Sequence, residues 1–165
     1  MCQGTLEVEG VGTIASPAVA SIDEVISGMA SSAGPTYLIL KTSSGSYIQA
    51  AGSSGRYVVE SRDVYGEGFL HWRAATAATA GESTATILFR NRCPNRAHPP
   101  RGCPLIVAAT QVVNLDAVRR AVLHYAATGE RCSGFHWHDV SGGFSKEGSG
   151  DEIRPIVPRG RDARS

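Results

Sequence analysis

The sequence contains no long apolar run, and its charges are nearly balanced. No stretch approaches the roughly 20 apolar residues that a membrane-spanning helix needs. Sixteen Lys and Arg against fifteen Asp and Glu give a net charge of +1, which argues against a protein that neutralises many phosphates. The opening MCQGTLEVEG has neither the basic nor the apolar region of a secretory signal. We therefore expect a cytoplasmic protein that binds neither membrane nor nucleic acid.

Cysteine is scarce, and signatures of catalysis are missing. The four Cys residues among 165 are expected to be free thiols, because the cytoplasm keeps thiols reduced. The sequence contains no G-x-S-x-G nucleophile elbow and no G-x-x-x-x-G-K-[ST] phosphate loop. A hydrophobic fraction of 42% and a charged fraction of 19% are typical of one soluble domain. We expect no catalytic residue, no cofactor and no enzymatic activity.

Two amphipathic helices are predicted. The first covers Ser21–Ala33, where Ser21 and Glu24 match a capping box and Gly34 follows the end. The second begins after Asn114, a favourable N-cap, and ends at Gly129, which suits a left-handed C-terminal position. Apolar stripes at helical spacing run along both, formed by Ile22, Val25, Ile26 and Met29 in the first and Leu115, Val118, Val122 and Tyr125 in the second. Asp116 and Arg120 are spaced for an i,i+4 ion pair.

Strands fill most of the remaining chain. The expected strands are Tyr37–Lys41, Ser46–Ala51, Arg56–Arg62, Phe69–Ala75, Thr84–Arg90, Leu105–Ala109 and a last strand over 135–140. Short Gly- and Ser-rich turns favour an antiparallel meander. We predict an α+β fold, an antiparallel sheet of about 4–6 strands with both helices packed on one face. Residues 1–20 form a lead-in or edge strand, 21–140 the domain, and 141–165 a flexible tail.

Aromatic and charged side chains are mixed on two of the predicted strands and the turn between them. This mixture is typical of protein-binding surfaces, although a solvated hairpin has the same composition. The candidate binding residues are Tyr57, Glu60, Arg62, Asp63, Tyr65, Glu67, Trp72 and Arg73.

A metal site is the alternative hypothesis. Cys93, His98 and Cys103 are spaced C-x4-H-x4-C in a proline-rich loop, and thiolate and imidazole are the ligands that zinc prefers. His136 and His138 alternate with Phe135 and Trp137, so both imidazoles fall on one strand face. The usual C-x2-C pair is missing, so a stiff surface loop and an exposed strand face explain the same residues. A third hypothesis is an adaptor protein that binds through the basic tail over 141–165.

The order of elements resembles the immunity-protein family of bacterial polymorphic and contact-dependent toxin systems, which includes inhibitors of deaminase toxins. The resemblance rests on SIDEVISGM, YLILK, SYIQAAG, RYVVESR, LDAVRRAVLHYAATGE and FHWHDV. In that family a helix with an aromatic residue near its end, a glycine turn and a Trp-containing last strand close a small α+β domain. Tyr125, Gly129 and Trp137 stand at those places. The similarity covers Ser21–Ala75 and Asn114–Val140.

This resemblance implies a protein that acts by stoichiometric binding. It would neutralise a cognate toxin in competition between bacteria by blocking the toxin's active site or substrate path. Such an inhibitor needs preformed shape, a few aromatic or Arg anchors and no catalytic residue. The resemblance also implies a monomer or weak homodimer when the toxin is absent. The segment Ala80–Thr110 is longer than the family pattern.

Overall fold

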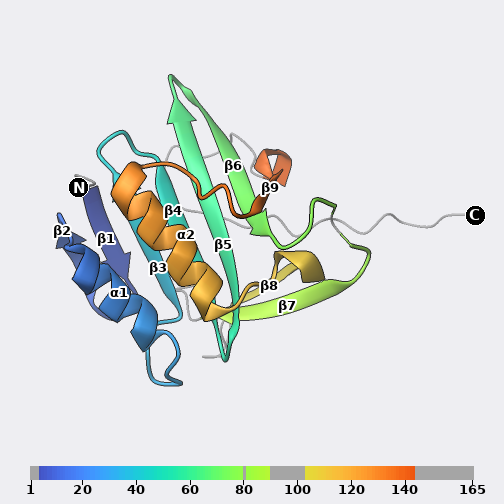
Figure 1. Cartoon of the computed structure of the whole chain (residues 1–165), viewed down its shortest axis with the longest axis horizontal. Helices are drawn as coiled ribbons and strands as arrows, with labels where there is room; N and C mark the ends of the chain where they lie inside the picture. The colour runs from blue at the N-terminus through green and yellow to red at the C-terminus, as the bar shows by residue number, and fades with distance from the viewer. Residues whose placement is uncertain (1–3, 80, 90–102, 144–165) are drawn as a thin grey trace, which may run out of the picture.

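The computed structural model describes residues 4–79, 81–89 and 103–143. Over these residues the chain forms two α-helices, a seven-stranded antiparallel sheet and a separate two-stranded hairpin (Figure 1). The predicted α+β class is confirmed, with more strands than expected. The large sheet contains β1 (Gly4–Val8), β2 (Gly12–Ala15), β3 (Tyr37–Thr42), β4 (Tyr47–Ser53), β5 (Arg56–Tyr65), β6 (Gly68–Ala75) and β9 (His136–Asp139). The small hairpin contains β7 (Thr84–Phe89) and β8 (Cys103–Ala108).

The large sheet has the strand order β2-β1-β3-β4-β5-β6-β9, and every neighbouring pair is antiparallel. Strands β3 to β6 form the predicted meander, because each joins the next through a short turn. The N-terminal residues add the hairpin β1–β2 at one edge, with Gly10 and Gly12 at positive φ beside its turn. The last strand returns beside β6 at the other edge.

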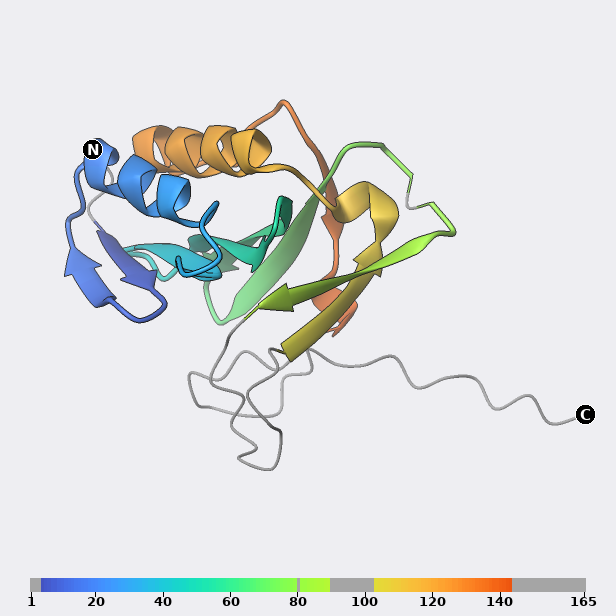
Figure 2. The same cartoon turned by 90° about the horizontal axis from the view of Figure 1, so that it is seen from below.

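Both helices, α1 (Val19–Gly28) and α2 (Leu115–Thr128), cover one face of this sheet (Figure 2). Strand alternation directs one set of apolar side chains toward them, and the same buried cluster contains the apolar stripes of the helices. Its fully buried members include Leu38, Leu40, Ile48, Val59, Val118, Val122 and Tyr125. Phe135 and Trp137 pack against this cluster, as the alternation of the last strand predicts. No helix among the described residues is long and apolar enough to cross a membrane.

The N-cap and C-cap of α2 are the residues that the sequence predicts. The amide of Ala117 donates to Asn114 Oδ1 at 2.9 Å, and Gly129 ends the helix in the left-handed region with φ 74°. The predicted ion pair on this helix is wrong. Asp116 Oδ1 lies 3.6 Å from Nη1 of Arg119, so Asp116 pairs with the residue at i+3 and not with the predicted residue at i+4. The predicted partner, Arg120, instead lies over the ring of Phe135.

The predicted bounds of α1 are wrong at both ends. The helix begins at Val19 after Ala18, so Ser21 already lies inside the first turn and is not the N-cap. It ends at Gly28, because the chain then folds back along the end of the helix. Gly34 sits there against the carbonyl of Gly28, in a space where a Cβ atom would lie 1.9 Å from that oxygen. Turn hydrogen bonds from the amide of Ser31 to the carbonyl of Gly28 and from the amide of Gly34 to the carbonyl of Ser31 hold this local turn, which replaces the predicted last turn of the helix.

The β7–β8 hairpin lies on the face of the large sheet that is opposite to the helices (Figure 2). Ile87 and Val107 pack there against Val58 of β5. A 3-10 helix, η1 (Ala109–Gln111), then leads toward α2. A second one, η2 (Ser141–Gly143), covers the first three residues of the segment predicted as a tail; the rest of that segment lies outside the described residues.

Candidate functional site

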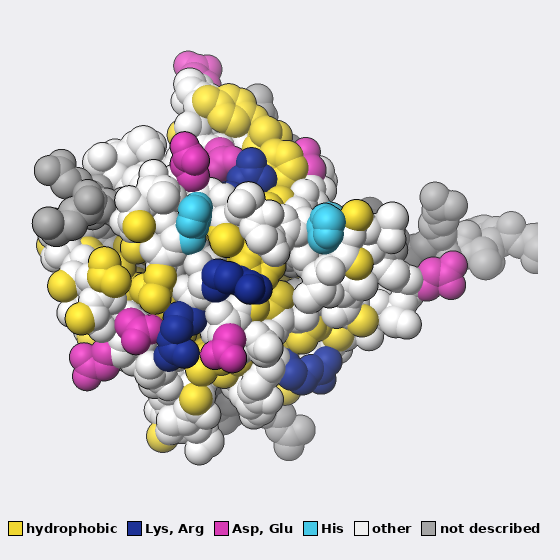
Figure 3. Space-filling view, in the orientation of Figure 1, with side chains coloured by type: hydrophobic (Ala, Val, Ile, Leu, Met, Phe, Trp, Pro, Cys, Tyr) yellow, Lys and Arg dark blue, Asp and Glu magenta, His cyan; other side chains and the backbone are white. Residues whose placement is uncertain are grey.

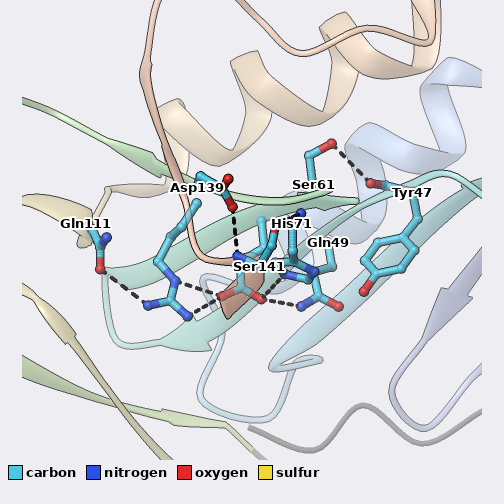
Figure 4. A network of polar contacts seen from close by, with 9 residues as sticks. Tyr47, Gln49, Ser61, His71, Gln111, Asp139 and Ser141 are labelled. Atoms are coloured by element: carbon cyan, nitrogen blue, oxygen red, sulfur yellow. Dashed lines mark hydrogen bonds and ion pairs between the residues drawn. The ribbon is translucent and has the colours of Figure 1, made fainter. Parts of the chain in front are cut away.

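A buried polar network occupies the centre of the sheet on the face away from the helices (Figure 4). The antiparallel register places Gln49 of β4 opposite Glu60 of β5, and Glu60 opposite Arg73 of β6. Three polar side chains from three successive strands therefore stand in one row. His71 of β6 stands opposite Arg62, two residues before Arg73, and reaches the row from the same face of the sheet because residues i and i+2 share a face of a strand.

Glu60 is the centre of this network, and both of its oxygens are occupied. Oε1 accepts from Arg73 Nε at 2.7 Å and lies 2.6 Å from Arg73 Nη2. Oε2 accepts from Gln49 Nε2 at 2.6 Å and lies 3.2 Å from His71 Nε2. Glu60 is 5% exposed and His71 is 1% exposed. A carboxylate at this depth is tolerated because paired charge and hydrogen bonds offset its desolvation.

The pKa of Glu60 reports the balance between burial and these partners. Burial by itself raises the pKa of a carboxyl group, since it disfavours the charged form. The hydrogen bond with His71 and the positive charge of Arg73 act in the opposite direction and prevail, so the pKa of Glu60 falls from 4.5 to about 2. Glu60 is therefore ionised at neutral pH. A general base works best with a pKa near the operating pH, so Glu60 is suited to holding the sheet together and not to proton transfer.

The network also connects the sheet to the segments that surround it. Gln111 Oε1 accepts from Arg73 Nη1 at 3.3 Å and from the amide of Ala108 at 3.1 Å, which joins β6 to β8 and η1. The amide of His71 donates to Ser141 Oγ at 2.8 Å, and its carbonyl accepts from the amide of Val140. Segments far apart in the sequence thus meet around one carboxylate (Figure 4).

A second polar feature lies farther along β5, on the same face. The guanidinium carbon of Arg62 lies 3.7 Å from the centre of the Phe69 ring and 5.9 Å from that of the Tyr47 ring. Stacking of this kind is worth about 0.5–2 kcal/mol, depending on exposure. Burial, opposed in part by the charge of Arg62, raises the pKa of Tyr47 to about 12. The tyrosine therefore stays neutral over the ordinary pH range.

An arginine stack braces the same hairpin from the other face. Arg131, in the loop after α2, lies over the ring of Trp72 at 4.1 Å and lies 5.7 Å from the ring centre of Trp137. Its Nε is 3.4 Å from Asp63 Oδ2. Trp137 Nε1 donates to the carbonyl of Cys132 at 2.9 Å, which holds the loop against β9. The β5–β6 hairpin is thus supported by an arginine on each of its two faces.

The end of this hairpin projects beyond the neighbouring strands (Figure 1). Strand β5 continues to Tyr65, whereas its pairing with β4 stops at Arg62. The predicted turn over 63–68 is shorter in the structure, because pairing continues to Tyr65 and Gly68. Val64 is 36% exposed and Tyr65 is 53% exposed, and apolar surface is visible on the projecting end in Figure 3.

The eight predicted binding residues lie on β5, β6 and their turn, but alternation divides them between the two faces. Tyr57 faces the helices, is fully buried and donates from its hydroxyl to the carbonyl of Met29 at 3.0 Å, so it is not on a surface that a partner can reach. Glu60 is buried in the polar network. Tyr65 and Glu67 are exposed at the projecting end. The others, Arg62, Asp63, Trp72 and Arg73, are partly buried in the ion pairs and stacks described above.

The residues of the metal hypothesis are only partly described. Cys93 and His98 lie outside the described residues, and of Cys103 only the place in β8 is described. His136 and His138 lie on one face of β9 as predicted, opposite Ala75 and Arg73 of β6, and His138 Nε2 is 3.1 Å from the carbonyl of Ala77. Over the part of the chain that is described, no three His, Cys, Asp or Glu side chains form a group that could hold a metal ion.

Sequence reasoning missed Gln49, His71 and Gln111 as members of the network. Gln49 and His71 lie on predicted strands. Which side chains they meet across the sheet depends on the register between the strands, and the sequence does not reveal that register. Gln111 lies outside every predicted strand and helix. The sequence matches no protein-family model and no curated protein.

Proposed function

We propose that the protein is an immunity-type inhibitor that binds a cognate bacterial toxin stoichiometrically and blocks its active site or substrate path. The proposal starts from the family resemblance of the sequence. The observation that carries it is the projecting end of the β5–β6 hairpin, where Val64 and Tyr65 are exposed beside Glu67. This hairpin end, residues 63–69, is the proposed contact with the toxin.

Rigidity of the hairpin end favours a binding role. Its ladder pairs Asp63 with Leu70, Val64 with Phe69 and Tyr65 with Gly68. The Arg62–Phe69 stack on one face and the Arg131–Asp63 ion pair on the other restrain its base. A loop that is already ordered loses less conformational entropy when it binds, so more of the contact energy appears as affinity.

The side chains at the hairpin end also suit a protein partner. Tyr65 offers a large ring with a polar tip, and tyrosine is enriched among the residues that dominate binding energy. The adjacent Val64 adds apolar surface, and Glu67 places a negative charge at the turn. A partner with a concave apolar patch and a basic rim fits this arrangement. The neighbouring ionised Glu60 has both oxygens occupied, which supports binding without chemistry.

The proposal predicts that a neighbouring reading frame encodes a large secreted protein with a small toxic C-terminal domain, and that domain is the partner used in the test. The full chain should form a one-to-one complex with that domain and should protect cells in which both proteins are produced. A toxin domain that is neither bound nor neutralised by the full chain would overturn the proposed function.

The site of contact is tested separately by two variants. Tyr65→Ala should weaken the complex by about 2 kcal/mol or more, roughly 30-fold in affinity. The matched control is Leu88→Ala, which also removes an exposed apolar side chain, 56% exposed on β7, and should leave the affinity unchanged. If Leu88→Ala weakens the complex and Tyr65→Ala does not, the toxin binds another surface and the hairpin contact is rejected.

A further inference from the structure

The outer edge of β2 offers unpaired backbone groups. The amide of Ser16 donates to the carbonyl of Gly4 at 2.8 Å, and Ile14 stands opposite Leu6 in the register. Because antiparallel bonds alternate along a strand, the amide and carbonyl groups of Thr13 and Ala15 point away from β1. Both residues are exposed, and within the described part of the chain no strand pairs with this side of β2.

This edge lacks the charged side chains that commonly prevent a strand from pairing with another chain. Natural edge strands carry charges, especially Lys, that prevent such pairing. The sequence contains no charged residue from Gly10 to Ile22, a stretch that includes the whole of β2. The nearest charged cross-strand neighbour, Glu7 opposite Thr13, is already paired with Lys41 at 3.2 Å. Val11, 67% exposed, adds apolar surface beside the strand.

Absence of charge is the property that a symmetric contact requires. In a two-fold interface a residue on the axis faces its own copy and the residues beside it lie close to theirs, so a charge there comes near a like charge. An uncharged edge is therefore complementary to itself. The opposite edge of the sheet differs, because β9 presents His136, His138 and Asp139.

We propose that two copies of the chain associate through antiparallel pairing of their β2 strands. The two-fold axis passes beside Ile14, and Thr13 of each copy exchanges backbone hydrogen bonds with Ala15 of the other. The two sheets then form one continuous fourteen-stranded sheet with all helices on one face. The short strand makes the contact small and the dimer weak. The β5–β6 hairpin ends lie several strands away from the axis and stay accessible.

The mass of the full chain in solution, measured from micromolar to millimolar concentration, tests the association. It should rise with concentration from that of one chain toward twice that value. Hydrogen exchange of the Thr13 and Ala15 amides should slow over the same range. Exchange of the Ser16 amide, bonded within one chain, should not change. A single-chain mass at every concentration, or a dimer in which the Thr13 and Ala15 amides stay unprotected, would overturn the proposal.

Proline tests the backbone bonds directly. Ala15→Pro removes an amide hydrogen that is unbonded in the single chain, so the variant should keep the melting temperature of the wild type and lose at least tenfold in dimer affinity. Ala15→Val keeps the amide and serves as the matched control, with dimer affinity close to that of the wild type. Equal dimer affinity for the two variants would contradict pairing through β2.

Opposite charges test whether the partner is a second copy. Thr13→Lys and Thr13→Glu should each be monomeric alone, because each places like charges across the axis. An equimolar mixture of the two should recover a dimer that contains one of each. Failure of the mixture to associate, or unchanged self-association of either variant, would reject the symmetric contact. Toxin binding does not enter any of these measurements, so they are independent of the proposed function.

Discussion

Glu60 and Arg73 face each other across β5 and β6, and two nitrogens of one guanidinium, Nε and Nη2, lie within 2.7 Å of a single carboxylate oxygen. The other oxygen is held by Gln49 and His71. Burying two charges costs desolvation energy that their attraction only repays when the remaining hydrogen bonds are also made. Removing one member of such a closed set is therefore more harmful than the net value of the pair suggests.

Glu60→Gln should lower the free energy of unfolding by about 3–5 kcal/mol, because it leaves the guanidinium of Arg73 buried without its counter-charge. Urea unfolding followed by tryptophan fluorescence measures this loss. The control is Glu7→Gln, which breaks the half-exposed pair with Lys41 and should cost about 0–1 kcal/mol. Similar losses for the two variants would show that the network contributes no more than a surface pair.

Acid should destabilise the fold through Glu60. Its pKa is about 2 in the folded chain against 4.5 for an ordinary glutamate, so the unfolded chain takes up the proton first. This contribution is fully present above about pH 4.5 and is lost as the pH falls toward 2, and it amounts to about 3 kcal/mol. Unfolding free energies measured across this range should fall less steeply for Glu60→Gln than for the wild type. Parallel curves would contradict the depressed pKa.

Alanine should destabilise the fold by different amounts at the two residues that the sequence predicts as helix N-caps. Asn114→Ala removes the bond to the amide of Ala117 and should cost about 1 kcal/mol, within the range of 0.5–2 kcal/mol for N-caps. Ser21→Ala should cost less, because Ser21 lies inside α1 and does not cap it. Thermal unfolding of the two variants, with Asn114→Ser as a conservative replacement that keeps the cap, measures the difference. A larger loss for Ser21→Ala would place the start of α1 at the predicted position.

Two glycines near the β4–β5 connection, Gly52 within β4 and Gly55 in the turn, should differ in their tolerance of alanine. At Gly52, φ is 143° and an added Cβ would lie 2.1 Å from the carbonyl oxygen of Arg56, so Gly52→Ala should cost about 3 kcal/mol or more. At Gly55, φ is 78° and a Cβ would meet no atom of the described chain within 4 Å, so Gly55→Ala should cost about 1–2 kcal/mol. Chemical denaturation of both variants tests this order, and the reverse order would contradict the close approach of β4 and β5 at Gly52.

Chelation should leave stability unchanged. The proposed inhibitor needs no metal, so treatment with EDTA should not alter the melting temperature, and elemental analysis of the purified protein should find no zinc. His136→Ala, which removes an exposed side chain of the metal hypothesis, is the matched variant. Its melting temperature should likewise be the same with and without EDTA. Stoichiometric zinc, with stability lost on chelation, would favour the alternative hypothesis of a zinc protein that uses the Cys and His residues.

Local patterns of the sequence determined the elements whose stabilising contacts lie within a few residues. The cap at Asn114, the left-handed Gly129 and the stripe through Val118 and Val122 involve groups within one or two helical turns. The meander from β3 to β6 followed in the same way, because a short turn places consecutive strands side by side in antiparallel orientation. The predicted class and the two helices on one face rested on these features.

Tertiary structure alone decided where distant segments meet. The row of Gln49, Glu60 and Arg73 depends on a register between strands, and a shift by one residue would turn the carboxylate toward the helices. Pairing of β1 with β3, the return of β9 to β6 and the β7–β8 hairpin on the second face depend on contacts between residues far apart in the chain. Hydrogen bonds and burial at such separations leave no periodic trace in the sequence, which is why the polar network became visible only in the folded chain.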